Sequence, residues 1–216
     1  MPLSPPFTDL GRIHDRAMPI ETRLKRRGQQ LTLRPVVPQD AELLAQLVEG
    51  MTPASRRNRF HGVVRLSPCH FDQMSVIDGL ASLAWVVATE INGAERLIAD
   101  ARYVVEPDGQ GAEFALMVTD CWQGQGVGAW AMQALQRAAT NAGLQWMHAE
   151  VLRGNLPMLG LMQRCGFALS PDTEDDRVVK VQRRLGAPTA PGPVVQHGLR
   201  SWLRNAWPAT TLAAAR

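Results

Sequence analysis

The segment from Glu113 to Phe167 constrains the fold of this chain more than any other stretch. It opens with a short apolar run, Phe114 to Val118, which is rich in strand-forming residues and predicts a buried strand. A loop with three glycines follows, and then a helical pattern whose apolar residues recur every three or four positions. Gly143 stands where a left-handed residue would end this helix. We therefore expect a strand, a glycine loop and a long helix in direct succession.

The glycine loop, Gln123 to Gly128, has the properties of an anion site. The first backbone N–H groups of a helix lack internal partners, and the helix dipole puts partial positive charge there. Glycines let an oxyanion such as pyrophosphate approach the main chain closely. The loop has no Lys or Arg, so the backbone would have to do the binding. Taken alone, this pattern also fits a tight turn that binds no ligand.

Two other phosphate-binding motifs do not fit this loop. A P-loop would end in Gly-Lys-Ser/Thr, which is absent here. The lysine that contacts the β/γ-phosphates and the hydroxyl that binds Mg²⁺ in a P-loop are therefore both missing from this loop. The glycines follow the spacing G-x-G-x-G, whereas a Rossmann dinucleotide site has G-x-G-x-x-G.

The loop resembles the signature of the GNAT family of N-acetyltransferases. Gln123-x-x-Gly126-x-Gly128 after a strand is similar to that family's Q/R-x-x-G-x-G/A motif, and Asn155 followed by Gly166-Phe167 is similar to its later segment. The resemblance covers about Gln30 to Leu185. It implies an α/β acyl-CoA N-acyltransferase fold, a mixed and mostly antiparallel sheet with helices on both faces.

The same resemblance implies that acetyl-CoA is the co-substrate and that no metal takes part. Two strands, Glu113–Val118 and Trp146–Leu152, should splay to admit the pantetheine arm. Asn155 would either orient that arm or cap the helix that begins there. The expected contacts to acetyl-CoA are Leu116, Met117, Val118, Gln123, Gly124, Gln125, Gly126, Val127, Gly128 and Asn155.

A second stretch, Met51 to Phe60, narrows the resemblance. Its Ser55, Arg59 and Phe60 are similar to the L-S-x-x-S-x-x-x-R-F segment in the acyltransferase domain of bacterial Pat-type protein lysine acetyltransferases. This likeness implies a protein lysine as acceptor. In these enzymes a glutamate in an A-E-x-A segment is the general base, and that role falls here to Glu113. From the residues alone, Glu113 could also be a strand-edge carboxylate that faces water.

Other polar residues of the chain have plainer interpretations. Asp120 is expected to stabilise the turn between strand and loop, and His148 to be a core or surface residue of its strand. The arginines between Arg56 and Arg65 could be structural, or could steer an acidic partner or the 3′-phosphate of coenzyme A. The family usually has a tyrosine as general acid four residues before Gly-Phe, and Met162 takes its place here; the chain's only tyrosine, Tyr103, lies on another strand.

Length and composition limit the number of domains and the kinds of partner that this chain can have. The 216 residues suit one domain, residues 30–185, with an N-terminal extension, residues 1–29, and a Pro/Gly linker with a short amphipathic helix, residues 186–216. The net charge of +3 does not imply nucleic acid. Three cysteines without metal-type spacing predict free thiols in a reducing compartment, and no apolar run reaches transmembrane length. We expect a cytoplasmic protein without stable membrane association, and the choice between monomer and homodimer stays open.

The predicted reaction is direct acetyl transfer to an amine in a ternary complex, without a covalent enzyme intermediate. Two alternatives stay open: acetylation of a small amine, such as an antibiotic, polyamine or amino acid, and a non-catalytic module that binds or senses acyl-CoA. Met162 in the usual tyrosine position is the feature that favours the non-catalytic alternative.

Overall fold

A computed structural model describes residues 22–62, 65–79 and 81–186 of the chain. Its centre is an eight-stranded sheet with the strand order β1-β2-β3-β4-β5-β6-β8-β7. The strands are β1 Thr22–Arg26, β2 Gln29–Pro35, β3 Ser82–Ile91, β4 Ala94–Val105, β5 Gly111–Val118, β6 Trp146–Leu152, β7 Ala168–Pro171 and β8 Val178–Arg184.

The sheet is mixed, with one parallel pair. Strands β5 and β6 run parallel because α4, Val127–Asn141, connects them as a crossover. The other neighbouring strands pair antiparallel. The long β3–β4 hairpin turns at Asn92 and Gly93, which both have positive φ, as a two-residue hairpin turn requires. The predicted fold class is therefore confirmed.

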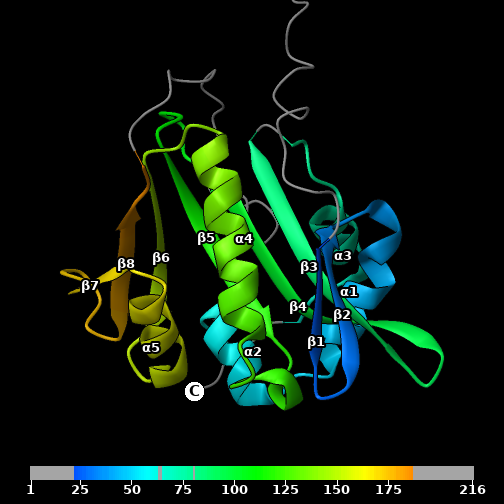
Figure 1. Cartoon of the computed structure of the whole chain (residues 1–216). Coiled ribbons are helices and arrows are strands. Elements are labelled where there is room, and N and C mark those ends of the chain that lie inside the picture. The colour runs from blue at the N-terminus through cyan, green and yellow to red at the C-terminus, as the bar shows by residue number, and fades with distance from the viewer. Residues whose placement is uncertain (1–21, 63–64, 80, 187–216) are drawn as a thin grey trace, which may run out of the picture.

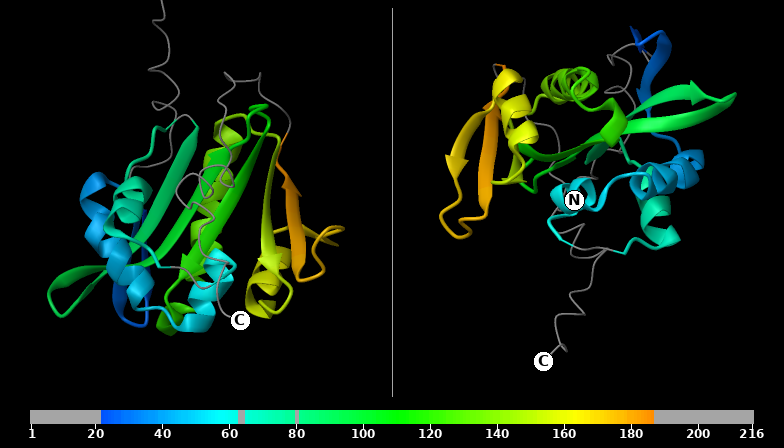
Figure 2. Two further views of the ribbon diagram at one scale, coloured as in Figure 1. Left: turned by 180° about the vertical axis from the view of Figure 1, so that it is seen from behind. Right: turned by 90° about the horizontal axis from the view of Figure 1, so that it is seen from below.

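Helices cover both faces of the sheet. In Figures 1 and 2, α4 and α5, Leu156–Arg164, lie on one face, and α1, Ala41–Glu49, α2, Pro53–Phe60, and α3, Pro68–Ser75, lie on the other. The apolar stripe of α4 packs on inward side chains of β4, β5 and β6 and forms the larger core. The stripes of α1 and α3 form a second core. Within the described residues, no helix is both long and apolar enough to cross a membrane.

The N-terminal part of the sheet differs from the sequence prediction. Residues 1–29 were expected to be an extension, but Thr22–Arg26 form the edge strand β1, which pairs with β2. The alternation of apolar and polar residues that marks a strand is weak in β1, because only Leu24 is apolar and packs against the larger core. Helix α1 begins at Ala41, directly after the 3₁₀ turn Pro38–Asp40. The predicted C-terminal helix lies outside the described residues.

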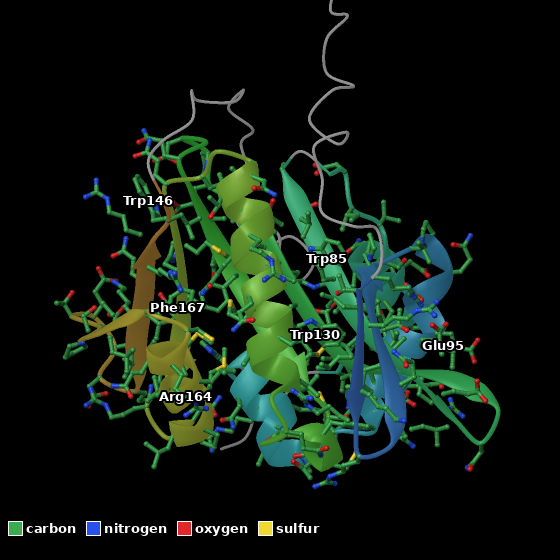
Figure 3. All side chains as sticks on the ribbon, in the orientation of Figure 1. Trp85, Glu95, Trp130, Trp146, Arg164 and Phe167 are labelled. Atoms are coloured by element: carbon green, nitrogen blue, oxygen red, sulfur yellow. The ribbon has the colours of Figure 1, made fainter. Side chains whose placement is uncertain are left out.

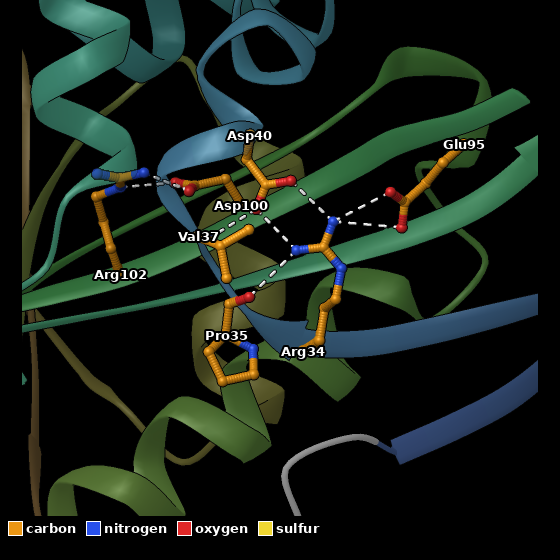
Figure 4. A network of polar contacts seen from close by, with 7 residues as sticks. All are labelled: Arg34, Pro35, Val37, Asp40, Glu95, Asp100 and Arg102. Carbon is orange, nitrogen blue, oxygen red and sulfur yellow. Dashed lines mark hydrogen bonds and ion pairs between the residues drawn. The ribbon is translucent and has the colours of Figure 1, made fainter.

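A polar network fixes the corner between β2 and α1. Asp40, which is only 2% exposed, accepts hydrogen bonds from Arg34 at 2.7 and 2.8 Å and from the backbone N–H of Val37 at 2.9 Å (Figure 4). Arg34 also reaches Glu95 on β4 at 3.3 Å. Because the buried carboxylate is fully paired, it holds α1 on the sheet instead of destabilising the core.

Candidate active site

The site begins where the two parallel strands separate. Pairing between β5 and β6 covers Gly111 to Glu113 on one strand and Trp146 to His148 on the other, so Glu113 and His148 form the last pair. Beyond it the strands diverge, and main-chain groups of β5 become available to a ligand. The predicted splay of these strands is thus present in the structure.

A cavity of about 1060 Å³ fills the fork and extends to the glycine loop. This volume lies at the upper end of the range for small-molecule sites, as expected for a long ligand. Its walls come from Met51, which follows α1, and from α2, β5, the glycine loop, β6 and α5. The lining residues that matter below are Ser55, Asn58, Arg59, His61, Glu113, Leu116, Met117, Val118, Gln123, Gly124, Gly126, Gly128, Glu150, Asn155 and Arg164.

The glycine loop has the backbone geometry of an anion site. Gly124 and Gly126 have φ of 71° and 84°, the left-handed region that favours glycine. A Cβ atom added at either position would meet no protein atom within 4 Å, so the space before the helix is open. Gly126 is the N-cap of α4, and the N–H groups of the next residues have no carbonyl one turn back. The residues present therefore fit a diphosphate.

Gly128 has a different function from the other two loop glycines. A Cβ there would lie 3.1 Å from a methyl carbon of Leu161 and 3.5 Å from side-chain atoms of Leu116 and Val118. The missing side chain lets α4 pack closely against β5 and α5.

Two of the predicted contact residues do not line the cavity. The side chain of Val127 is fully buried in the larger core, because the first residue of α4 points into the sheet. The amide of Gln125 turns back and donates to the Cys121 carbonyl at 2.6 Å. Of these two residues, only the main chains can face a ligand, and the contacts expected of this loop are main-chain contacts. The other eight predicted contact residues and Glu113 do line the cavity.

Helix α2 is tied to the glycine loop by Asp120. Its carboxylate accepts hydrogen bonds from the N–H and hydroxyl of Thr52, both at 3.0 Å, and from the Ser55 hydroxyl at 2.6 Å. Burial raises the pKa of Asp120, but these hydrogen bonds outweigh it and hold the pKa below its usual value. The sequence predicted a stabilising role within the turn, whereas the hydrogen bonds of Asp120 connect two distant segments.

Two carboxylates line the cavity, Glu113 from β5 and Glu150 from β6. His148 lies on the strand beside Glu113 but does not line the cavity; its Nε2 is 2.9 Å from Oε1 of Glu106. Trp146, at the far end of β6 from Arg164 in Figure 3, donates to the other oxygen of Glu106 at 3.1 Å. His148 is thus a partly exposed strand residue, as predicted.

Comparison with known proteins identifies the domain. Residues 30–168 match the family described as acetyltransferase (GNAT) domain. The chain belongs to the GNAT acetyltransferase family. An acetyltransferase of Pseudomonas aeruginosa is 29% identical over 70% of this chain and 82% of its own length. The acetyltransferase Pat of Mycolicibacterium smegmatis is 32% identical over 69% of this chain, which spans only 44% of that protein.

Solved GNAT structures agree with the fold. The GNAT domain of S. lividans PAT superposes with a TM-score of 0.68 at 27% identity, covering 76% of this chain and 97% of that one. A cAMP-binding acyltransferase from Mycobacterium smegmatis gives a TM-score of 0.53 at 28% identity, and the match covers 77% of this chain and 48% of that one.

This GNAT domain lacks a side-chain acid in the usual tyrosine position. Met162 is fully buried in α5 and is absent from the cavity wall. Tyr103 is 4% exposed within the core, and burial raises its pKa, so it cannot serve a thiolate in the cavity. Asn155 caps α5 by accepting from the Met158 N–H at 3.3 Å, and it also lines the cavity.

Several residues of the cavity wall carry no signal in the sequence. Asn58, His61, Glu150 and Arg164 line the cavity but were not predicted as site residues. In Figure 3, Arg164 lies at the end of α5, at the same end of the molecule as α2. For the residues of α2, the only feature in the sequence that could indicate a site is its richness in arginine, and this is equally typical of a solvated helix.

Proposed function

We propose that this GNAT enzyme transfers acetyl from acetyl-CoA to the side-chain amine of a protein lysine, with Glu113 as general base. The observation that carries this proposal is that one cavity joins the glycine loop to Glu113. Such a cavity can hold the diphosphate at the loop and the thioester at the fork. Support for a protein acceptor comes from the Pat relatives and from the α2 segment that resembles theirs.

The expected contacts to acetyl-CoA follow from the walls of this cavity. Backbone N–H groups at the start of α4 would bind the diphosphate, without a cation in the loop. The diverging strands would accept the pantetheine arm beside Leu116, Met117 and Val118, and Asn155 would face it from α5.

The reaction requires a neutral amine. With a pKa of about 10.4, a free lysine is only about 0.1% neutral near pH 7.4. In the proposed ternary complex the amine nitrogen attacks the thioester carbon, and the new C–N bond replaces the C–S bond. Glu113 takes the proton that the nitrogen loses, directly or through one water. Coenzyme A leaves as a thiolate and is protonated by solvent, since neither Met162 nor Tyr103 can supply the proton.

The replacement Glu113→Gln tests the base. It keeps the shape of the side chain and should retain acetyl-CoA affinity, while kcat should fall by about 10²–10⁴. The residual rate should rise with pH as free lysine loses its proton. Glu150→Gln is the comparison, because it removes the other carboxylate that lines the cavity. Near-parental turnover of Glu113→Gln, together with loss in Glu150→Gln, would reassign the base to Glu150.

The acceptor can be identified in the same assay. Release of coenzyme A with proteins of the host lysate, but not with a panel of antibiotics, polyamines and amino acids, would support a protein acceptor; mass spectrometry then locates the acetyllysines. Turnover with small amines alone would refute the lysine assignment.

A non-catalytic acyl-CoA-binding module is the second candidate. It is favoured by the burial of Met162 in the usual position of the general acid. Tight binding of acetyl-CoA without turnover on any of these acceptors would establish it.

A further inference from the structure

The hairpin of β1 and β2 places a cation on the glycine loop. It turns at Arg27 and Gly28, whose φ values of 48° and 80° are both positive, as a type I′ turn requires. Directly before this turn, Arg26 donates from its Nε to the main-chain carbonyl of Gln125 at 3.3 Å. Figure 1 shows the hairpin turn at the same end of the sheet as the start of α4. The tip of the hairpin therefore lies beside the loop.

The alternation of side chains in β1 decides which of its cations faces the loop. Leu24 packs against the larger core, which lies between the sheet and α4. Side chains two positions apart point to the same face of a strand, so Arg26 shares the face of Leu24, and Lys25 points to the other face. Helix α4 contacts β3, β4 and β5, which brings its N-terminal loop across the sheet toward β1. Of these two cations, Arg26 is the one directed at the loop.

The guanidinium of Arg26 is exposed, and no carboxylate neutralises it. Its hydrogen bonds go to main-chain carbonyls, that of Gln125 and, at 3.2 Å, that of Lys25. The part of the chain that the structure describes gives it no ion pair. A guanidinium has more N–H groups than these two bonds use, and its planar fork suits phosphate oxygens. Arg26 can therefore keep its contact with the loop and still bind a phosphate.

The order of groups in acetyl-CoA indicates which phosphate Arg26 would meet. Pantetheine joins the thioester to the diphosphate, and the ribose that carries the 3′-phosphate follows the diphosphate. With the thioester at the fork and the diphosphate at the loop, the 3′-phosphate must lie beyond the loop, outside the cavity. Arg26 is not among the residues that line the cavity, yet it touches the loop. Its position thus fits the 3′-phosphate.

We propose that Arg26 binds the 3′-phosphate of coenzyme A and makes the enzyme prefer this coenzyme over its 3′-dephospho form. The inference rests on the proposed function, because it takes the glycine loop as the diphosphate site. A phosphate monoester has a charge of about −1.5 to −2 near pH 7, so it attracts an unpaired guanidinium more strongly than one diphosphate oxygen would. The loop itself has no Lys or Arg, and the cation for the coenzyme comes from the neighbouring hairpin.

Arg26 could also affect binding by holding the loop in place through the Gln125 carbonyl. Loss of that bond would disturb the diphosphate site and would weaken every ligand that contains the diphosphate. Loss of a bond to the 3′-phosphate would weaken only ligands that contain this group. Coenzyme A and 3′-dephospho-coenzyme A differ in this phosphate alone, so comparing them separates the two effects.

The test is calorimetric titration of the parent and its variants with these two ligands at low salt. The parent should bind coenzyme A about fivefold more tightly than the dephospho form, the upper end for an exposed ion pair. Arg26→Gln should remove this preference by weakening coenzyme A binding alone, and Arg26→Lys should keep part of it. Lys25→Gln is the matched control, since it removes an exposed charge from the other face of the same strand. It should keep the preference.

Three results would overturn the inference. Equal weakening of both ligands by Arg26→Gln would make Arg26 only a clamp on the loop, and an unchanged preference would give it no part in binding. An equal effect of Lys25→Gln, or of Arg57→Gln on the exposed side of α2, would mean that the phosphate responds to overall charge or binds elsewhere. If Arg26→Gln does not fold, Arg26→Met is the second neutral variant.

The proposed function can fail separately from this inference. The ligand preference is measured without turnover, so near-parental activity of Glu113→Gln would refute the base and leave the result on Arg26 unchanged. If the parent binds neither coenzyme A nor its dephospho form, the diphosphate site is refuted and the inference falls with it.

Discussion

Replacing Gly126 by Asp and by Asn separates the charge of a loop side chain from its shape. Gly126 caps α4 with φ of 84° and ψ of −2°, and a Cβ there would meet no protein atom within 4 Å. A new side chain would therefore enter only the open space before the helix N-terminus. Asn and Asp have nearly the same shape, and both tolerate the left-handed conformation better than most residues.

The two variants share one effect and differ in another. An L-residue in this conformation costs about 1–2 kcal/mol of stability, and this applies to both. The carboxylate of Asp adds repulsion from a bound diphosphate, about 1 kcal/mol per charge pair at 4 Å in water and about 4 kcal/mol at an effective dielectric constant of 20. We therefore expect Gly126→Asp to bind acetyl-CoA at least about tenfold more weakly than Gly126→Asn, about 1.4 kcal/mol.

The same carboxylate should have the opposite effect on the ligand-free protein. A negative charge at a helix N-terminus is favourable by about 0.3–1 kcal/mol, so Gly126→Asp should unfold at a slightly higher temperature than Gly126→Asn. Calorimetric titration with acetyl-CoA measures the affinities, and the gap between the variants should narrow as salt is added. Equal affinities of the two variants, both close to the parent, would refute the loop as the diphosphate site.

Two further predictions concern residues outside the loop. Met162→Leu should leave turnover within a few-fold of the parent, because the buried Met162 only packs α5; a hundredfold loss in a variant of normal thermal stability would give this position a chemical role. Asp120→Asn should lower the free energy of unfolding by about 1 kcal/mol at neutral pH, since it weakens bonds to Thr52 and Ser55. Because the folded-state pKa of Asp120 lies below 3.8, its contribution is present above pH 3.8 and lost as pH falls through the folded value. Denaturant titrations of the variant and the parent should therefore converge in acid, and a constant difference would contradict this account.

The parts of the fold that could be predicted are those with a local signature. The glycine loop, the start of α4 and the left-handed Gly143 are set by residues a few positions apart, and all three lie where the sequence puts them. The turn at Asn92 and Gly93 is local in the same way. Patterns of this kind need no knowledge of what packs against them.

Strand β1 shows the limit of this reasoning. Its sequence, Thr-Arg-Leu-Lys-Arg, resembles a solvated arm because four of its five residues are polar. An edge strand needs only one apolar side chain on its inner face, and Leu24 provides it. The rest of its stabilisation is pairing with β2, which composition does not reveal. One consequence is that Arg26 donates to the carbonyl of Gln125 at 3.3 Å, so β1 brings a cation to the glycine loop, which has no Lys or Arg of its own.

For the candidate site too, the residues within one local motif could be predicted, and the residues from other segments could not. Residues of β5 and of the loop belong to one continuous segment, so a single motif identified most of them. Asn58, His61 and Glu150 come from other segments, and only the folded sheet brings them to the cavity. No sequence motif links these three residues, because they come together only through the tertiary fold.

Asp120 shows why such tertiary contacts matter to the chemistry. It follows β5 directly and begins the turn into the glycine loop, yet its oxygens hold Thr52 and Ser55, 68 and 65 residues earlier in the chain. Helix α2 starts at this contact, and its Arg59 lines the same cavity as Glu113. Helix α2 and the glycine loop, two walls of the same cavity, are thus held together by one carboxylate that does not itself line the cavity.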